Sequence, residues 1–268
     1  MDYLSELEHE SIFVLREAYR RFGRIALLWS MGKDSTVLLW MCRKAFLGRV
    51  PFPVVHIDTS YEFDEIYAYR ALLAREWGLD LVVRRNEAAL AAGMGRHSAD
   101  MLTCCNALKT EALGAAIRDL ALEAVLVGIR RDEHGIRAKE RYFSPREGDG
   151  GWNYRSQPPE LWELYASQRD GAEHTRIHPL LHMTELDIWH YVEREQIPVS
   201  ELYFARDQRR FRSIGCRTCC QAIDSSASSV SEILHEIGMP AAVAERAGRM
   251  HDQESAYLMQ KLRSLGYM

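Results

Sequence analysis

The sequence predicts an α/β fold: a doubly wound, mostly parallel sheet followed by a helical carboxyl-terminal region. Short apolar runs alternate with segments of helical length from Ile25 onward. Runs of this kind are typical of strands that helices cover on both faces. Polar or glycine-containing segments follow directly where several of these runs end, which is where parallel sheets bind their ligands.

The elements are expected in the following order. Residues 3–22 form an amphipathic helix, because apolar residues such as Leu7 and Val14 recur at helical spacing. The first strand covers Ile25–Trp29. The strands expected after it are Val54–Asp58, Leu79–Val83 and Ala124–Gly128, and the helices between the strands are Ser35–Phe46, Asp64–Trp77 and Lys109–Leu120.

The periodic pattern is lost between Arg131 and Gln168, where charged residues, glycine, proline and aromatic residues are mixed. This stretch is too long for an ordinary loop. A helix begins again after Thr184, which suits an N-cap, and acidic residues such as Asp187 are favourable in its first turn. The chain after Ser229 is again expected to be helical.

Composition limits the class of protein. The chain has 268 residues, of which 47% are hydrophobic and 27% charged, with a formal net charge of −4. This charge argues against bulk attraction to nucleic acid or to a membrane surface. No apolar stretch is long enough to span a membrane, and the acidic amino terminus does not resemble a signal peptide. We therefore expect a cytoplasmic protein, whose six cysteines are metal ligands or catalytic thiols rather than disulfides.

The strongest functional signal is the segment that joins the first strand to the next helix. Its backbone N–H groups and the helix N-terminus could bind an anion. Lys33 adds a positive charge, and Asp34 could help to position Mg²⁺. The common P-loop is absent, because Leu27 stands where its first glycine would be. An ordinary strand–helix connection is the plain alternative. The residues expected to bind phosphate are Ser30, Gly32, Lys33, Asp34, Ser35 and Thr36, with Lys33 and Asp34 also catalytic.

Two further polar segments are expected at the same edge of the sheet. Asp58 ends the second strand, where it could contact the nucleotide or a metal ion, or only cap the next turn. Gly128 ends the fourth strand and permits close approach of nucleotide or backbone. Arg130 and Arg131 could clamp phosphate or sulfate oxygens, or lie on a solvated helix face. We expect Asp58, Arg130 and Arg131 to be catalytic, because the carboxyl ends of parallel strands meet at one edge.

These motifs resemble two related groups of enzymes. Ser30–Ser35 resembles the Ser-Gly-Gly-Lys-Asp-Ser loop of the N-type ATP pyrophosphatases, which cut ATP between the α and β phosphates. Met31 replaces a glycine of that loop, so the turn must be one that an L-residue can adopt. Arg130–Glu133, Arg137–Arg141 and Pro159–Trp162 resemble the small, nucleotide-binding subunits of bacterial sulfate adenylyltransferases.

The resemblance implies an adenine nucleotide alpha hydrolase-like fold that uses ATP with Mg²⁺. It implies an ATP pyrophosphatase domain over residues 1–200. The remaining residues, 201–268, are then a cysteine-containing and helical region.

The cysteines depart from that subunit. Cys104 and Cys105 are adjacent, and Cys216 and Cys219 form a Cys-x-x-Cys. Four thiolates can hold one [4Fe–4S] cluster, and this arrangement resembles the cluster-bearing adenylylsulfate reductases. Zn²⁺ in a Cys₄ site is the alternative metal, and free buried thiols are the plain reading. Cys220 is either a catalytic, sulfur-carrying thiol or merely a neighbour, and no cysteine follows it to act as those reductases' catalytic cysteine.

The main functional hypothesis is an ATP-dependent sulfur-insertion enzyme. ATP adenylylates an oxygen of the acceptor, and activated sulfur then displaces AMP, as in DNA phosphorothioation enzymes and some tRNA thiolation enzymes. A cysteine desulfurase would be a suitable sulfur donor. A nucleic acid acceptor fits the arginine-rich run at residues 206–212.

Two alternatives remain open. The chain could make adenylylsulfate from ATP and sulfate beside a GTPase partner subunit, or it could be a nucleotide-binding regulator without turnover. A homo-oligomer is also compatible with the sequence, whereas a membrane partner is not expected.

Overall fold

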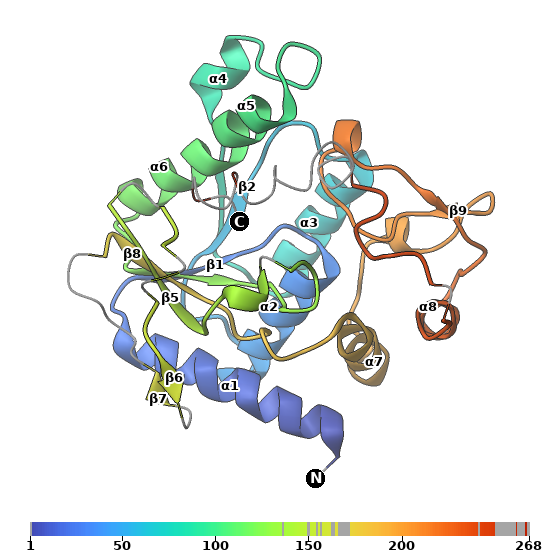
Figure 1. The fold of residues 1–268 in the computed structure, drawn as a ribbon, viewed down its shortest axis with the longest axis horizontal. Helices are drawn as coiled ribbons and strands as arrows, with labels where there is room; N and C mark the ends of the chain where they lie inside the picture. Colours follow the sequence, from blue (N-terminus) through green and yellow to red (C-terminus); the bar gives the residue numbers. More distant parts are fainter. Residues whose placement is uncertain are drawn as a thin grey trace.

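The computed structural model describes residues 2–135, 137–148, 151–153, 155, 157–161, 164–165, 172–240, 242–249, 261 and 266. A sheet lies at its centre (Figure 1). It has six strands, in the order β3-β2-β1-β4-β8-β5. Its strands are β1 Ile25–Leu28, β2 Val54–Ile57, β3 Leu81–Arg84, β4 Ala124–Val127, β5 Phe143–Arg146 and β8 His174–Ile177.

The sheet is doubly wound, as predicted. Neighbouring strands are parallel, with β5 alone antiparallel to its neighbour β8. From β1 the chain proceeds to β2 and β3 on one side, and then returns to β4 on the other side of β1. The strand order therefore changes direction between β1 and β4, which is where such sheets form ligand crevices.

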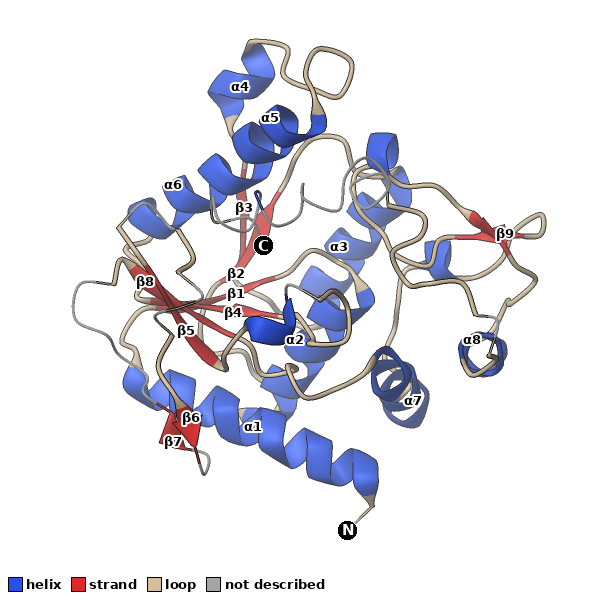
Figure 2. Cartoon of the chain, viewed as in Figure 1, coloured by secondary structure: helices blue, strands red, loops and turns tan. Residues whose placement is uncertain are grey.

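Helices cover both faces of the sheet (Figure 2). Right-handed crossovers place α2 and α3 on one face and α6 on the opposite face. Among the described residues, no helix combines the length and apolar character needed to cross a membrane. The helices are α1 Tyr3–Arg21, α2 Lys33–Ala45, α3 Asp64–Glu76, α4 Glu87–Ala91, α5 Met101–Cys105, the π-helix η1 Asn106–Glu111, α6 Ala112–Asp119, α7 Glu185–Glu195 and α8 Val230–Ile237.

Three largely apolar strands form the core. Every residue of β1, β2 and β4 is buried, which accounts for the runs that identified these strands in the sequence. Thr184 is the N-cap of α7, as predicted, and it forms a capping box with Asp187: the Thr184 hydroxyl accepts from the Asp187 N–H at 3.2 Å, and the Asp187 carboxylate accepts from the Thr184 N–H at 2.8 Å. Short segments complete the fold, namely β6 Glu160–Leu161, β7 Leu164–Tyr165, β9 Arg209–Arg210, β10 Ile223–Asp224 and the 3₁₀ turns η2 Arg137–Lys139, η3 Glu201–Tyr203 and η4 Arg217–Cys219.

The sequence reading missed β5 and β8. Both strands are fully buried although they carry arginine and histidine. The buried charge of Arg146 is compensated by Glu140, whose carboxylate lies 2.9 Å from Arg146 Nη2. Pro145 also interrupts the β pattern in β5, which is an edge strand where proline is tolerated. β5 and β8 were therefore not predicted, because their polar residues do not give the apolar pattern of a buried strand.

The helical tail was predicted too broadly. The tail forms α8, but the described residues from 238 to 249 are turns and one isolated bridge. Trp162 and most of the chain after Arg249 lie outside the described residues. The division of the chain at residue 200 stays a prediction.

Candidate functional site

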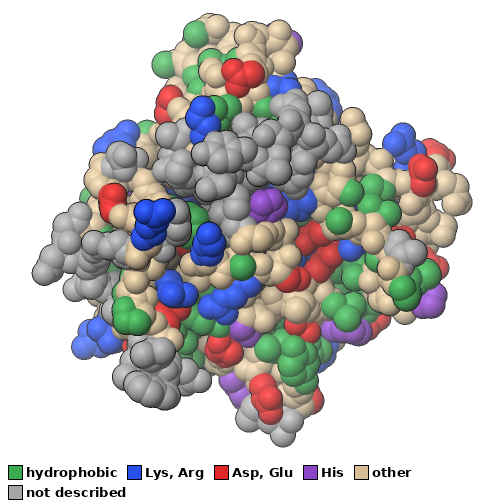
Figure 3. Space-filling view, viewed as in Figure 1, with side chains coloured by type: hydrophobic (Ala, Val, Ile, Leu, Met, Phe, Trp, Pro, Cys, Tyr) green, Lys and Arg blue, Asp and Glu red, His purple; other side chains and the backbone are tan. Residues whose placement is uncertain are grey.

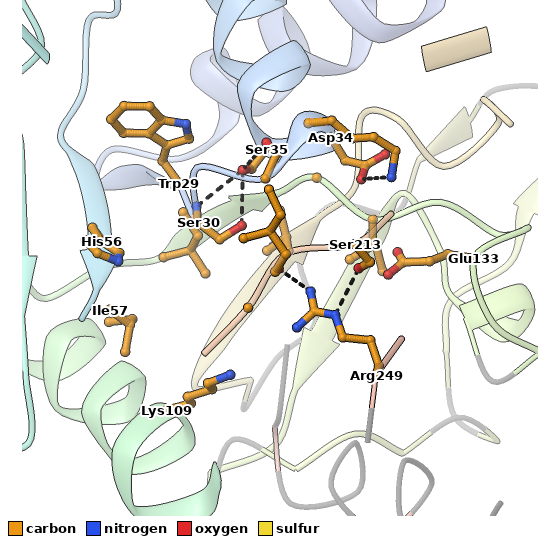
Figure 4. Close-up of a pocket in the computed structure, with 18 of the residues that line it drawn as sticks. Trp29, Ser30, Asp34, Ser35, His56, Ile57, Lys109, Glu133, Ser213 and Arg249 are labelled. Carbon is orange, nitrogen blue, oxygen red and sulfur yellow. Dashed lines mark hydrogen bonds and ion pairs between the residues drawn. The ribbon is translucent and has the colours of Figure 1, made fainter. Parts of the chain in front are cut away.

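A cavity of about 180 Å³ lies at the carboxyl ends of β1, β2 and β4 (Figure 4). Leu28, Ile57 and Val127 are the last residues of these strands and line the cavity. The cavity therefore lies where the strand order changes direction, as the sequence predicted for a ligand site. Other lining residues labelled in Figure 4 are Trp29, Ser30, Asp34, Ser35, His56, Lys109, Glu133, Ser213 and Arg249.

The predicted phosphate loop forms part of the cavity wall. Helix α2 begins at Lys33, and its N-cap Gly32 has no side chain that could cap the first N–H groups, which favours an anion there. The Ser35 hydroxyl accepts from the Ser30 N–H at 3.3 Å and donates to the Gly32 carbonyl at 3.1 Å. These hydroxyl contacts fix the loop around the helix start.

Met31 adopts a left-handed backbone conformation, with φ of 57°. This small region is open to L-residues at a cost of about 1–2 kcal/mol, so the loop tolerates methionine where the related loop has glycine. The Met31 side chain is 1% exposed and belongs to the hydrophobic core. Its burial offsets the backbone strain.

At Gly128, the backbone that follows β4 contacts the backbone of α2. A Cβ at this position would lie 3.0 Å from the Ser35 N and Cα atoms. The glycine therefore lets the end of β4 approach the first turn of α2, and it also lines the cavity.

A buried ionic network links Lys33, Asp34 and Arg130. Arg130 is fully buried and donates to Asp34, to Asp132 Oδ1 at 2.9 Å and to Glu245 Oε2 at 2.6 Å. Lys33 Nζ contacts Asp34 Oδ2 at 3.2 Å and pairs with Glu245 Oε1. Burial alone would raise the pKa of Glu245, but the charges of Lys33 and Arg130 lower that pKa to about 2. The predicted Lys33, Asp34 and Arg130 are therefore brought together.

Sequence reasoning missed the contribution of the tail. Arg246 and Arg249 line the cavity, where Arg246 Nη1 lies 2.8 Å from Glu133 Oε1 and Arg249 Nε donates to Ser213 Oγ at 2.9 Å. Lys109 also lines the cavity. In the sequence, Glu245 and Arg246 resemble ordinary charged residues of a tail. Only their position in the fold shows that they belong to the site.

His56 is a further lining residue without a predicted role. Burial and the nearby Arg70 lower the pKa of His56 to about 4. The imidazole is therefore neutral at pH 7 and adds no charge to the cavity.

Two predicted site residues face away from the cavity. The Thr36 hydroxyl is buried, where it accepts from Trp29 Nε1 at 3.1 Å and from the Tyr69 hydroxyl at 3.3 Å. Thr36 is thus a packing residue rather than a phosphate ligand. The Arg131 guanidinium lies 5.2 Å from the centroid of the Tyr142 ring, a cation–π contact that directs it away from the phosphate loop.

The Asp58 carboxylate is also occupied by contacts outside the cavity. Its buried carboxylate pairs with Arg85 at 2.7 Å and with Arg70 at 3.2 Å, and it accepts from the Tyr67 hydroxyl at 3.0 Å and the Ser60 N–H at 2.8 Å. Burial opposes ionisation, but these partners lower the pKa of Asp58 to about 2. These contacts agree with a structural role for Asp58 at the end of the strand. They do not agree with a catalytic role.

The four predicted metal-ligating cysteines lie close together. Cys105, Cys216 and Cys219 form a buried cluster with Met101, and burial together with the charges of Cys216 and Cys219 raises the pKa of Cys104. Burial raises the pKa of Cys105 to about 11, so this thiol is protonated at neutral pH in the absence of a metal.

The cysteines do not form a ready site for a single ion. Among the described residues, no three Cys, His, Asp or Glu side chains are arranged to hold one metal ion. Cys220 lies outside the buried cysteine cluster and pairs through its backbone with Arg249 in an isolated bridge. Its sulfur-carrying role stays a prediction.

Comparison with known proteins identifies the family. Residues 24–222 match the phosphoadenosine phosphosulfate reductase domain family. The chain belongs to this family. It is also 41% identical to "Sulfate adenylyltransferase subunit 2" of Myxococcus xanthus, covering 97% of this chain and 95% of that protein. The protein of the same name from Rhodospirillum rubrum is 40% identical, with both chains fully covered.

These matches confirm the resemblance seen in the phosphate loop and the Arg130 segment. The chain is an adenylyltransferase enzyme of sulfur metabolism.

Similarity to solved structures confirms the fold. The phosphoadenylyl-sulfate reductase of Candida auris aligns with a TM-score of 0.56 at 18% identity, covering 83% of this chain and 98% of that chain. A U34-tRNA thiolase of Methanococcus maripaludis, solved with its [4Fe–4S] cluster, aligns with a TM-score of 0.52 at 15% identity, covering 96% and 76%. At these identities the likeness concerns the fold alone.

Proposed function

We propose that the chain transfers the adenylyl group of ATP to sulfate and releases pyrophosphate. The observation that carries this proposal is that two cations meet beside the phosphate loop: Lys33, which lines the cavity, and the buried Arg130 both pair with the Glu245 carboxylate. A sulfate oxygen attacks the α-phosphorus, the bond from that phosphorus to the oxygen bridging to the β-phosphate breaks, and pyrophosphate leaves with the electron pair. The names of the relatives from Myxococcus xanthus and Rhodospirillum rubrum support sulfate as the acceptor.

The residues of the cavity suit this reaction. The N–H groups at the start of α2 hold the departing pyrophosphate, and Lys33 and Arg130 neutralise the charge that develops on it. Lys109, Arg246 and Arg249 supply further positive charge in the same cavity, which suits a second anion such as sulfate.

Asp34 does not fit a magnesium ligand in this arrangement. Arg130 donates to one of its carboxylate oxygens, and Lys33 Nζ lies 3.2 Å from the other. Both oxygens are therefore bound to cations already. Asp34 instead orients the two cations that face the phosphates.

Exchange of labelled pyrophosphate into ATP tests the proposal. We expect the exchange to depend on sulfate. We also expect Lys33→Ala to lower the exchange rate by at least about 10²-fold, because the negative charge on the departing pyrophosphate loses the positive charge of Lys33. The matched control is Lys139→Ala, which removes an exposed lysine outside the cavity. Exchange that is equally fast without sulfate would contradict the choice of acceptor, and unchanged exchange in Lys33→Ala would contradict the assignment of the loop.

A partner subunit is part of this proposal. The relatives are named as one subunit of an enzyme, and the predicted partner is a GTPase subunit. The reaction is therefore best measured with the purified chain both alone and with the matching subunit.

Sulfur insertion is the second candidate, and the buried cysteines favour it. Cys104, Cys105, Cys216 and Cys219 provide four thiols from two segments, a donor set whose chemistry fits a [4Fe–4S] cluster. Such a cluster, when bound, would bind or relay sulfur from a donor such as a cysteine desulfurase. Zn²⁺ is the alternative ion for four thiols, but no three of the described side chains are arranged to hold a single ion.

The cluster prediction is tested by purification without oxygen. We expect a brown protein with about four irons per chain, and we expect Cys105→Ala and Cys216→Ala to lose colour and iron. Cys42→Ala is the matched control, because Cys42 is a buried thiol in α2 away from the cysteine cluster. A colourless protein with stoichiometric zinc would contradict the cluster.

A nucleic acid acceptor gains no support from the arginine-rich run. Arg210 and Arg212 are buried and paired with Glu236 and Glu185 at 2.6 and 2.9 Å, and Arg206 pairs with Glu201 at 2.5 Å. On the face shown in Figure 3, basic and acidic side chains of the described residues are interspersed. Arg210 and Arg212 therefore bind α8 and α7, and Arg206 lies in an exposed pair.

A further inference from the structure

We propose that Glu245 competes with the phosphate groups of ATP for Lys33 and Arg130, and so sets the affinity of the site for its nucleotide. This inference rests on the proposed function, because it requires that the two cations bind phosphate. Glu245 lies in the chain after α8, 212 positions from Lys33. Among the described tail residues, it is one whose side chain contacts the phosphate loop, through Lys33.

The Glu245 carboxylate occupies the position of an anion between the two cations. Its Oε1 atom pairs with Lys33 Nζ, and its Oε2 atom accepts from Arg130 Nη2 at 2.6 Å. The side chains are 10% exposed for Glu245, 2% for Lys33 and 0% for Arg130. Two oxygens of one phosphate group accept from the same kinds of donor. Because little room remains around these cations, phosphate and carboxylate cannot both bind them directly.

The backbone near Glu245 is held by contacts that do not involve its carboxylate. The Gln221 N–H donates to the Gly248 carbonyl at 2.9 Å, and Arg249 donates to Ser213 Oγ and to the Ile214 carbonyl. The carboxylate is thus presented to the cations at a high local concentration. When phosphate replaces it, the segment loses the two contacts of the Glu245 carboxylate and keeps its other contacts, among them the Arg246–Glu133 pair and those of Arg249.

Calorimetry with inorganic pyrophosphate tests the competition. Glu245→Gln preserves the shape of the side chain and removes its charge. We expect the Kd for pyrophosphate to fall about tenfold, the factor that corresponds to one hydrogen bond to a charged group. The matched control is Glu76→Gln, which removes the same charge from an exposed position on α3 and should leave the Kd unchanged.

Hydrogen exchange of the wild-type protein provides a second measurement that needs no variant. We expect pyrophosphate to accelerate amide exchange in the peptide that covers residues 242–249. Slower or unchanged exchange would overturn the competition, as would an equal or higher Kd in Glu245→Gln. If pyrophosphate binds neither the wild type nor the variants, the proposed function itself is overturned, and the competition with it.

Discussion

At the scale of a single residue, Asp58 shows that a residue's place along the sheet does not determine where its side chain points. It directly follows Ile57, the last residue of β2, which lines the cavity, whereas Asp58 itself does not line it. Its carboxylate instead binds Arg70 from α3 and Arg85 from the segment after β3. These partners are ordinary surface residues in the sequence, so only the folded arrangement reveals that they surround Asp58.

The lowered pKa of Asp58 predicts a pH dependence of stability. A carboxyl whose pKa falls from 3.8 to about 2 on folding stabilises the protein above pH 4, and this contribution is lost as the pH falls through 2. Asp58→Asn should therefore show a smaller loss of unfolding free energy between pH 4.5 and 2.5 than the wild type, by about 1.5 kcal/mol. Urea unfolding at the two pH values measures this difference.

Asp80→Asn is the matched control, because Asp80 is exposed. This variant should follow the wild type. Parallel pH profiles for Asp58→Asn and the wild type would contradict the role assigned to the two arginine pairs.

At the scale of elements, the site depends on how closely β4 approaches α2. The phosphate loop alone does not define the cavity, because the end of β4 forms the facing wall. The absence of a side chain at Gly128 sets the separation of the two backbones. The sequence indicated both segments, and it indicated the reason for a glycine, but it did not identify α2 as the element that approaches it.

Gly128→Ala is expected to damage the site. The added Cβ would lie 3.0 Å from backbone atoms of Ser35, so the first turn of α2 must move, and overpacking of this kind costs about 1–3 kcal/mol. We expect pyrophosphate exchange to fall by about tenfold or more, because a small misplacement of the groups that hold the reactants is costly. Thermal unfolding and exchange assays measure the two effects.

Gly23→Ala serves as its control. A Cβ at Gly23 meets only the carboxylate oxygens of Glu123 at 3.7 Å, an ordinary contact. Equal activity in Gly128→Ala and Gly23→Ala would show that the approach of β4 to α2 is not required.

At the scale of the whole molecule, the sequence predicted the elements that have a local apolar pattern. It did not predict the features that depend on contacts between residues far apart in the sequence. The parallel core was predictable because β1, β2 and β4 are buried on both faces and are therefore apolar apart from His56 in β2. β8 was not, because its buried histidine and arginine read as surface residues. The same applies to Glu245, whose partners Lys33 and Arg130 lie 212 and 115 positions away.

The cysteines follow the same division. Their grouping into two short segments was visible in the sequence, and the structure brings Cys105, Cys216 and Cys219 together. The spacing of residues cannot show, however, whether thiols converge on one ion or surround a larger group. That distinction depends on α5 and the segment around η4, which belong to opposite halves of the chain.

The proline in β5 has a consequence for self-association. β5 is the last strand of the sheet, and Pro145 has no N–H with which to continue a β ladder. A second copy of the chain therefore cannot extend the sheet continuously past this edge, and the same interruption opposes edge-to-edge aggregation. A symmetric dimer that continued the sheet by strand pairing would have to use the opposite edge, at β3.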